Sequence, residues 1–459
     1  MPKERLFGTD GVRGIVNQWL TPENALRLGL AIGSYFNQGA KILVGNDSRA
    51  GNAFILNAVV SALVSTGIRV FYAGPVPTPA LQLYVKNHDF DAGIMITASH
   101  NPPEYSGIKV ILSDGVEAPR EVEEAIEETY HELRFRRVHW SLLGYDVKRV
   151  DDVNTFYVES IINHLDIDSI SKKNLKVVVD GANNVGSLTT PQLLRRLGVK
   201  VLTVNCDLSH MPYREPEPTP DSLNELSLIV RSVGADLGIA HDGDADRAVF
   251  IDEKGNVLLG DRVGVLLCEY VLINKGLNIP KKVVTAISSS TIVEEVLSKY
   301  GVNVIWTKVG SINIARTMMK EGAFLGFEEN GGFIYGLHQY VRDGGMTAGL
   351  MVEYLAKSGL RLSELYNRLP SMYTIKTKVS IDRGDRGKIV EIVKHKLTEM
   401  FHSDLIMDID GIKVINPDYW ILVRPSGTEP LIRIFIEARN KELANRLLST
   451  VINIIHGAS

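Results

Sequence analysis

Two loops in this chain of 459 residues carry side chains suited to phosphoryl chemistry. Ser99 lies in the segment 97–102, directly after an apolar run, where a serine hydroxyl can act as a nucleophile if a neighbouring group activates it. Serine, asparagine and proline in succession are also typical of a plain turn, so this segment alone leaves both interpretations open. Lys109, at the start of the next apolar run, has the charge to hold a phosphate or to exchange a proton.

The second loop follows the apolar stretch 235–240 and places Asp242, Asp244 and Asp246 at alternate positions. Carboxylates spaced in this way converge on one hard cation such as Mg²⁺ and leave coordination positions for a phosphate oxygen and water. A calcium loop of the EF-hand type is excluded, because its required glycine is replaced by Arg247 and the flanking residues are strand-like. Arg247 is suited to neutralise a phosphoryl group; a solvated acidic turn is the structural alternative.

Three further loops offer groups that bind phosphates or sugars. The segment 424–430 combines the guanidinium of Arg424 with backbone and hydroxyl donors, which suits a phosphate, and it lacks the lysine of a nucleotide P-loop. The segment 326–332 offers carboxylate and amide groups that suit sugar hydroxyls, and the glycine-rich segment 7–14 contains one arginine, Arg13. Each of these segments is also compatible with a simple turn.

Strand-like and helical patterns alternate through the first 370 residues, which predicts open α/β sheets covered by helices. We expect strands at 41–45, 69–73 and 91–97 and helices at 52–65 and from 79 onward. The segments 91–101, 235–246 and 322–332 share one layout: an apolar strand that ends in a polar, glycine-bearing loop. Because open α/β sheets bind ligands at strand ends, we expect three similar α/β domains that present one loop each to a central cleft.

The region after residue 370 differs and predicts a smaller α+β C-terminal domain. Its expected strands and helices are 374–381, 388–400, 411–415, 420–424, 432–438 and 442–455. We therefore expect four domains, the first three with mixed sheets: 1–151 with the serine loop, 152–255 with the metal loop, 256–370 with the sugar loop and 371–459 with the phosphate loop.

Composition limits the classes of partner. A formal net charge of −4 gives no basic field for nucleic acid, and 45% hydrophobic with 23% charged residues is typical of a globular protein. The two cysteines cannot build a disulfide framework, and no signal peptide or membrane-spanning run is found, so we expect a cytoplasmic protein without a membrane partner. The acidic segment 120–128 is interpreted as a solvated helix face, and the oligomeric state is left open.

Taken together, the motifs resemble those of the α-D-phosphohexomutase family, the phosphomannomutases and phosphoglucomutases with the related phosphoglucosamine mutases. Five segments carry the resemblance in this order: FGTDGVRG (7–14), TASHNP (97–102), DGDADR (242–247), GFEENGG (326–332) and RPSGTEP (424–430). They extend across nearly the whole chain, and TASHNP followed by SGIK and then DGDADR is highly specific in combination.

The resemblance implies a role for each matching residue. Ser99 carries the transferable phosphoryl group, and its oxygen completes an Mg²⁺ site made by the three aspartates. His100, Lys109 and Arg247 surround the reacting phosphate, with Lys109 a candidate general acid or base. The substrate-binding residues that it implies are Arg13, Lys308, Glu328, Asn330, Arg424, Ser426, Gly427 and Thr428. Which residue is the general base is left open.

The implied reaction interconverts hexose 6-phosphate and hexose 1-phosphate through phosphorylated Ser99 and a hexose 1,6-bisphosphate, with Mg²⁺ as the cofactor and sugar phosphates as the partners. The segment 102–107 resembles the phosphomannomutase/phosphoglucomutase branch, which implies mannose or glucose, with glucosamine phosphate as the alternative. Many mutases read the sugar with Glu-x-Ser-Gly-His, whereas here Asn330 replaces the serine and Gly332 the histidine, so the sugar is not fixed. A non-catalytic sugar-phosphate sensor and a phosphatase are the rival classes.

Overall fold

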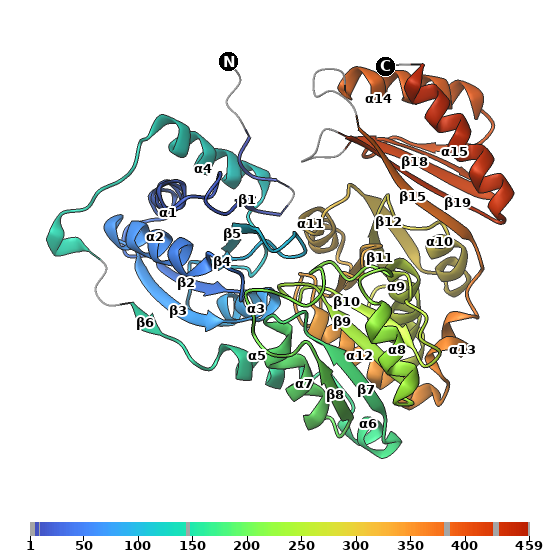
Figure 1. Ribbon diagram of the computed structural model, residues 1–459, viewed down its shortest axis with the longest axis horizontal. Coiled ribbons are helices and arrows are strands. Elements are labelled where there is room, and N and C mark those ends of the chain that lie inside the picture. Colours follow the sequence, from blue (N-terminus) through green and yellow to red (C-terminus); the bar gives the residue numbers. More distant parts are fainter. Residues whose placement is uncertain (1–4, 9, 144–146, 381–385, 426–430, 458–459) are drawn as a thin grey trace. The chain divides into compact units, whose positions relative to one another are not determined.

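A computed structural model describes residues 5–8, 10–143, 147–380, 386–425 and 431–457. Two compact units divide the chain: Met1–Gly260 with Asn330–Glu364, and Asp261–Glu329 with Leu365–Ser459. Both combine sheets with helices (Figure 1). Among the described residues, no helix is long and apolar enough to cross a membrane.

The first sheet of the first unit has the strand order β1-β5-β4-β2-β3-β6 and contains both parallel and antiparallel pairs. Its strands are β1 (Val12–Ile15), β2 (Lys41–Asn46), β3 (Arg69–Pro75), β4 (Ala92–Ile96), β5 (Tyr105–Leu112) and β6 (Lys148–Arg149). The helices in this part of the chain are α1 (Pro22–Tyr35), α2 (Asn52–Ser65), α3 (Thr78–Asn87), α4 (Arg120–Glu132) and the short η1 (Trp140–Leu142). Strand β4 is buried along its whole length, as its continuous apolar sequence predicts, and its end therefore fixes the start of the serine loop.

The second sheet of this unit has the order β10-β9-β7-β8. Its strands are β7 (Lys176–Asp180), β8 (Lys200–Val204), β9 (Leu237–His241) and β10 (Ala248–Asp252). The helices are α5 (Val153–Ile162), α6 (Ile167–Lys173), α7 (Gly186–Arg196) and α8 (Asn224–Ser232). From the later segment come β14 (Phe333–Tyr335) and α12 (Gly344–Ser358), and α12 packs on α5, α6 and α7. The first unit is thus completed by residues that follow much of the second unit in sequence.

The second unit contains two sheets. Three parallel strands, β11 (Lys282–Ala286), β12 (Asn303–Thr307) and β13 (Leu325–Phe327), occur with α9 (Gly260–Glu269), η2 (Tyr270–Asn274), α10 (Ile292–Leu297), η3 (Ser298–Tyr300) and α11 (Ser311–Glu321). After α13 (Leu362–Tyr366), an antiparallel sheet follows with the order β15-β19-β18-β17-β16. Its elements are β15 (Tyr373–Ser380), α14 (Arg386–Met400), β16 (Leu405–Met407), β17 (Ile412–Asn416), β18 (Tyr419–Pro425), β19 (Leu431–Ala438) and α15 (Lys441–His456). Helices α14 and α15 share one apolar core with this sheet (Figure 1).

This architecture confirms the predicted fold class of α/β domains with mixed sheets followed by a smaller α+β domain. The expected strands and helices occur, with ends that differ by a few residues. The interpretation of residues 120–128 as a solvated helix face holds for Glu121, Glu124 and Glu128, which are exposed, but not for Glu123 and Glu127, which are buried. Glu127 accepts the N–H groups of Leu6 and Phe7 and pairs with Arg120, so internal donors replace water.

The second unit contains a lysine, Lys413, whose side chain is buried among apolar and aromatic side chains. The side chain of Lys413 on β17 is fully buried, and its Nζ donates hydrogen bonds to the carbonyl oxygens of Ile287 (2.9 Å) and Ser289 (2.6 Å). The same Nζ lies 4.3 Å from the ring centres of both Trp306 and Trp420. Burial lowers the pKa of Lys413 to about 7, although acidic groups of this unit, Glu437 first among them, oppose the shift.

Lys413 predicts a pH dependence of stability. The unfolded lysine keeps its proton up to about pH 10.5 while the folded one loses it near pH 7, so the free energy of unfolding should rise with pH between these values. In Lys413→Met this rise should disappear, as measured by denaturant unfolding at several pH values from 6.5 to about 9.5. The exposed control Lys172→Met should keep it. An unchanged slope in Lys413→Met would contradict the prediction.

Candidate active site

Ser99 lies just beyond the buried end of β4 and is itself fully buried. Its backbone has φ 50°, in the left-handed region that a residue with a Cβ rarely adopts, and its N–H donates to the hydroxyl of Thr97 (2.9 Å). This turn directs the Ser99 hydroxyl to Asp242, whose Oδ2 accepts its hydrogen bond at 2.9 Å. The Nδ1 atom of His100 lies 3.4 Å from the same Oγ.

Asp242, Asp244 and Asp246 occupy the turn between the antiparallel strands β9 and β10. All three are buried, and one ligand atom from each lies within 4.8 Å of the others. The turn closes through Ala245 at φ 58°, which lets the alternate carboxylates point to one side. The Oδ1 atoms of Asp244 and Asp246 accept no hydrogen bond from the described residues. These orphaned, negatively charged oxygens fit a divalent cation such as Mg²⁺.

The environment shifts the pKa values of these carboxyl groups in different directions. Burial, together with the charges of its two neighbouring aspartates, raises the pKa of Asp242 well above the ordinary value. Burial also raises the pKa of Asp246. For Asp244, burial acts in the same direction, but the charge of Lys109 together with the hydrogen bonds from Thr78 and Lys109 lowers the pKa to about 2. The protein's own cations therefore stabilise one of the three carboxylates far better than the other two.

Lys109 and Arg342 bring positive charge to this cluster. The Nζ of Lys109 on β5 lies 2.9 Å from Asp244 and 3.1 Å from Asp10. Burial acts to lower the pKa of Lys109, yet the carboxylates of Asp10 and Asp244 raise it above the ordinary value. Arg342 pairs with Asp246 (2.5 Å) and Asp10 (3.3 Å). Lysine, arginine and carboxylates thus alternate around the site, and the two cations compensate part of its negative charge.

Arg247 and His100 lie next to the serine hydroxyl. The Nη2 of Arg247 donates to the Nδ1 of His100 at 2.9 Å, and its Nε lies 3.7 Å from Asp242. Burial, reinforced by the charge of Arg247, holds the pKa of His100 well below the ordinary value. The imidazole is therefore neutral, with Nδ1 as the acceptor.

The first unit brings together all of the predicted catalytic and metal-ligating residues: Ser99, His100, Lys109, Asp242, Asp244, Asp246 and Arg247. Arg13 joins them through hydrogen bonds to the Oδ1 of Asn101 (2.5 Å) and to Asp10 (2.7 Å). Asn330 also belongs to this unit, where its Oδ1 accepts the N–H of Gly332 (3.1 Å).

The remaining predicted substrate-binding residues belong to the second unit. Lys308 follows β12, and Glu328 follows β13, where its Oε1 accepts the N–H of Gly310 (3.1 Å). Arg424 lies on β18 and pairs with Asp410 (2.9 Å). Ser426, Gly427 and Thr428 lie outside the described residues.

Sequence reasoning missed several residues of this network. Asp10 was part of a recognised motif but had no assigned role, and Arg342 lies in no motif that we singled out. Thr78 at the start of α3 donates its hydroxyl hydrogen to Asp244 (2.6 Å). Burial, reinforced by the nearby charge of Asp10, raises the pKa of Glu117. None of these four residues stands out by its type or spacing in the sequence, so only the three-dimensional arrangement identifies them.

A buried serine hydroxyl that faces three carboxylates, surrounded by arginine and lysine, defines a phosphoryl-transfer site on α/β domains. Comparison with known proteins identifies the family. Sequence models of the phosphoglucomutase/phosphomannomutase α/β/α domains I, II and III match residues 4–137, 155–255 and 259–373, and that of the C-terminal domain matches residues 377–454. The chain belongs to this family, the α-D-phosphohexomutases, whose members are isomerases that act as intramolecular phosphotransferases.

Two relatives match along nearly their whole length. The phosphoglucosamine/phosphogalactosamine mutase of Sulfurisphaera tokodaii is 50% identical over 456 residues, 99% of each chain. The phosphoglucomutase/phosphomannomutase of Thermococcus kodakarensis is 42% identical over 459 residues, also 99% of each chain. Among solved structures, a phosphoglucomutase/phosphomannomutase family protein of Burkholderia thailandensis has a TM-score of 0.88 at 24% identity and covers 100% of this chain and 98% of its own, which shows the same fold.

The acidic cluster predicts a metal-dependent property. Asp244→Asn removes one charge from the three carboxylates, and we expect the affinity for Mg²⁺ to fall by at least about tenfold. Isothermal titration with Mg²⁺ measures this directly. Asp252→Asn is the matched control, since Asp252 is equally buried but caps the turn after β10 through the N–H groups of Lys254 and Asn256. An Mg²⁺ titration that is the same in Asp244→Asn and the natural chain would refute the metal assignment.

Proposed function

We propose that this chain interconverts hexose 6-phosphates and hexose 1-phosphates of mannose or glucose through phosphorylated Ser99 and a hexose 1,6-bisphosphate. The observation that carries the proposal is the hydrogen bond of 2.9 Å from the Ser99 hydroxyl to Asp242 inside a cluster of three buried carboxylates. A serine in this position exchanges a phosphoryl group without leaving the reach of the charges that stabilise the transfer.

The proposed transfer balances as follows. A free sugar hydroxyl attacks the phosphorus on Ser99, the bond from phosphorus to Oγ breaks, and the hydroxyl proton ends on the serine oxygen. The bisphosphate then turns, and its other phosphate returns to Ser99 by the reverse step. The three aspartates and the serine oxygen would hold Mg²⁺, which would neutralise phosphoryl charge there. Arg247 and Lys109 supply fixed positive charge from the protein, and His100, held by Arg247, lies against the serine oxygen.

Substrate binding is assigned to loops of both units. We infer that Arg13, Lys308, Glu328 and Asn330 contact the sugar phosphate and that Arg424, with Ser426, Gly427 and Thr428, grips the non-reacting phosphate. The corresponding division into domains 1–151, 152–255, 256–370 and 371–459 is part of this proposal, as is their arrangement around a cleft. The cytoplasmic location expected from the sequence stays a prediction.

A phosphoglucosamine mutase is the second candidate. The relative from Sulfurisphaera tokodaii, which bears the name of an amino-sugar phosphate mutase, is 50% identical, whereas the phosphoglucomutase/phosphomannomutase from Thermococcus kodakarensis is 42% identical. The sugar loop offers two carboxylates, those of Glu328 and Glu329, and the latter pairs with Lys376. Carboxylates accept hydrogen bonds from hydroxyl and ammonium groups alike, so the loop chemistry is compatible with both substrate classes.

Ser99→Ala tests the central role of the serine. We expect the mutase activity to fall below about 1% of the natural value, even with hexose 1,6-bisphosphate added, because no other side chain there replaces the hydroxyl. Intact mass should show one phosphoryl group on the natural chain and none on the variant. Ser65→Ala, which removes a hydroxyl bonded within α2, is the matched control and should keep full activity. Substantial mutase activity in Ser99→Ala would overturn the mechanism, and phosphate release without isomer formation would indicate a phosphatase.

A comparison of substrates tests the sugar. With the 1-phosphates of glucose, mannose and glucosamine in one coupled assay, we expect kcat/KM for glucose or mannose to exceed that for glucosamine by at least about tenfold. The opposite order would establish the amino-sugar candidate and leave the phosphoserine mechanism intact.

A further inference from the structure

Arg49 makes a cluster of hydrogen bonds to the serine loop that the proposed mechanism leaves unexplained. It follows β2, and its side chain is only 4% exposed. The Nη1 donates to the carbonyl oxygens of Pro102 (2.8 Å) and Tyr105 (3.0 Å). The Nη2 donates to the carbonyl oxygens of Asn101 (2.7 Å) and Ser99. One guanidinium thus binds four carbonyl groups of the loop that carries the serine.

These carbonyl groups need such a donor. The left-handed conformation of Ser99 is unfavourable for a residue with a side chain, so the turn persists only if its surroundings stabilise it. Backbone oxygens that converge in a buried place would lose hydrogen bonds to water without replacement. The flat fork of an arginine satisfies several carbonyl groups at once, which the single ammonium of a lysine cannot do with the same geometry.

Arg49 is itself fixed by buried groups. Its Nε donates to the Oδ2 of Asp47 at 3.2 Å, and the same carboxylate accepts hydrogen bonds from the hydroxyl of Thr97 (2.6 Å) and the amide of Asn52 (2.6 Å). Since Thr97 also accepts the N–H of Ser99, a closed circuit of hydrogen bonds joins Arg49, Asp47, Thr97 and Ser99. The guanidinium therefore has one defined position.

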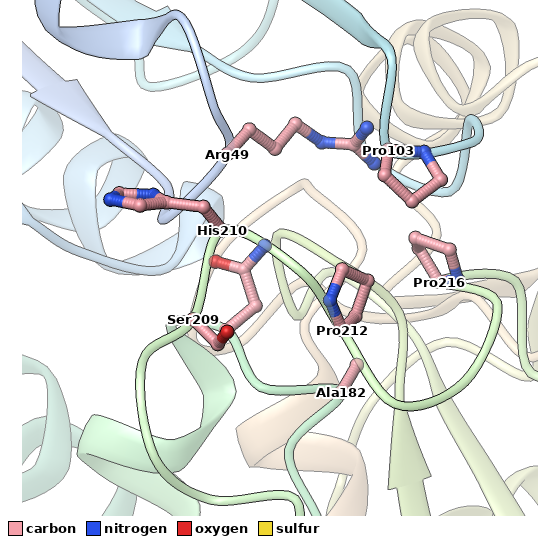
Figure 2. Close-up of a pocket in the computed structure, with 8 residues that line it drawn as sticks. Arg49, Pro103, Ala182, Ser209, His210, Pro212 and Pro216 are labelled. Atoms are coloured by element: carbon pink, nitrogen blue, oxygen red, sulfur yellow. The ribbon is translucent and has the colours of Figure 1, made fainter.

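The neighbouring residue, Ser48, hydrogen-bonds to the loops that follow β7 and β8. Its N–H donates to the Oδ1 of Asn184 (2.9 Å), its hydroxyl donates to the carbonyl oxygen of Asn183 (3.0 Å), and its own carbonyl oxygen lies 2.8 Å from the Nδ1 of His210. Arg49 lines a small pocket together with Pro103, Ser209, His210 and Pro212 (Figure 2). The volume of this pocket, about 10 Å³, is room for roughly one water molecule.

The metal loop also approaches this place. A Cβ on Gly243 would collide with the carbonyl oxygen of Ser99 and would lie 3.3 Å from the Nη2 of Arg49. Only glycine therefore lets the backbone between Asp242 and Asp244 reach the serine loop. The contact of Ser99 with Asp242 depends on this close approach of the two backbones. The guanidinium of Arg49 lies next to the point where they meet.

We propose that Arg49 is a positioning residue for phosphoryl transfer: its guanidinium holds the left-handed turn at Ser99 so that Oγ points to the three aspartates. This inference rests on the proposed role of Ser99. Arg49 affects where the serine oxygen lies. Among the described residues, its guanidinium makes no hydrogen bond to Arg13, Lys308 or Arg424, the proposed contacts of the substrate.

Arg49→Gln and Arg49→Lys test the proposal on the full chain with Mg²⁺ and hexose 1,6-bisphosphate. We expect kcat of Arg49→Gln to fall about 100-fold or more, because a displacement of about 1 Å in a reacting atom has effects of this size. KM should change by less than about threefold, since the proposed substrate contacts remain. Arg49→Lys should recover no more than about a tenth of the natural kcat, because charge without the fork restores one or two bonds.

Arg136→Gln is the matched control. The guanidinium of Arg136 also binds backbone carbonyl groups of the first unit, those of Gly33 (2.5 Å), Phe36 (2.7 Å) and Thr66 (2.8 Å), which belong to or follow α1 and α2. We expect this variant to lose thermal stability and to keep kcat within about twofold, since none of its partners belongs to the serine loop. Thermal unfolding and circular dichroism would compare the folded state of all variants.

The outcomes distinguish failure of the positioning role of Arg49 from failure of the proposed role of Ser99. The rate at which bisphosphate phosphorylates Ser99, followed by intact mass, should fall in Arg49→Gln together with kcat. Added guanidinium ion at millimolar concentration should restore part of the kcat of Arg49→Ala. The positioning role is overturned if Arg49→Gln keeps kcat within about threefold of the natural value, or if Arg49→Lys is fully active. If the natural chain shows mutase activity without phosphorylation of Ser99, the proposed function fails instead.

Discussion

The repulsion among three buried aspartates is the constraint on which the first unit depends. Asp242, Asp244 and Asp246 lie too close together, and too far from water, to be charged without compensation. Lys109 and Arg342 compensate part of this charge, and two carboxylate oxygens are left with no hydrogen bond from the described residues. The local fold thus leaves buried carboxylate oxygens that fit a divalent cation, a group suited to phosphoryl transfer.

Two strained turns bring the reacting groups together. Ser99 and Ala245 both have positive φ values although neither is a glycine, and each lies in the loop that leaves a fully buried strand, β4 or β9. Rigid strands fix where these loops begin, and dense hydrogen bonding fixes how they turn. Strain at these two places is compatible with a stable protein because the apolar cores of the sheets supply the stability.

Much of this could be predicted from the sequence, for identifiable reasons. Loops at strand ends and alternate aspartates are short-range patterns, so the α/β fold class and the family followed from residues such as Ser99 and Asp242, and both were confirmed. Arg49, Arg342 and Thr78 escaped, because an isolated arginine or threonine has no local signature and acts through partners far away in sequence. The burial of Glu123 and Glu127 was not expected either, because it depends on how α4 packs, on the pairing of both carboxylates with Arg120 and, for Glu127, on the distant N–H groups of Leu6 and Phe7. The roles of the site residues, those of Lys308, Glu328 and Arg424 included, stay predictions.

The position of Arg342 in the sequence has a consequence for how the site comes into being during synthesis. Arg342 and helix α12 belong to the first unit, but they follow the segment Asp261–Glu329 of the second unit. A nascent chain that has reached Gly260 already contains the serine and the three aspartates, yet lacks the arginine that pairs with Asp246 and the helix that packs on α5, α6 and α7. The charge balance of the site is completed only after the ribosome has also made the sugar loop. Assembly of the reacting centre is therefore a late event, deferred by chain order until the segment Asp261–Glu329 of the second unit has been translated.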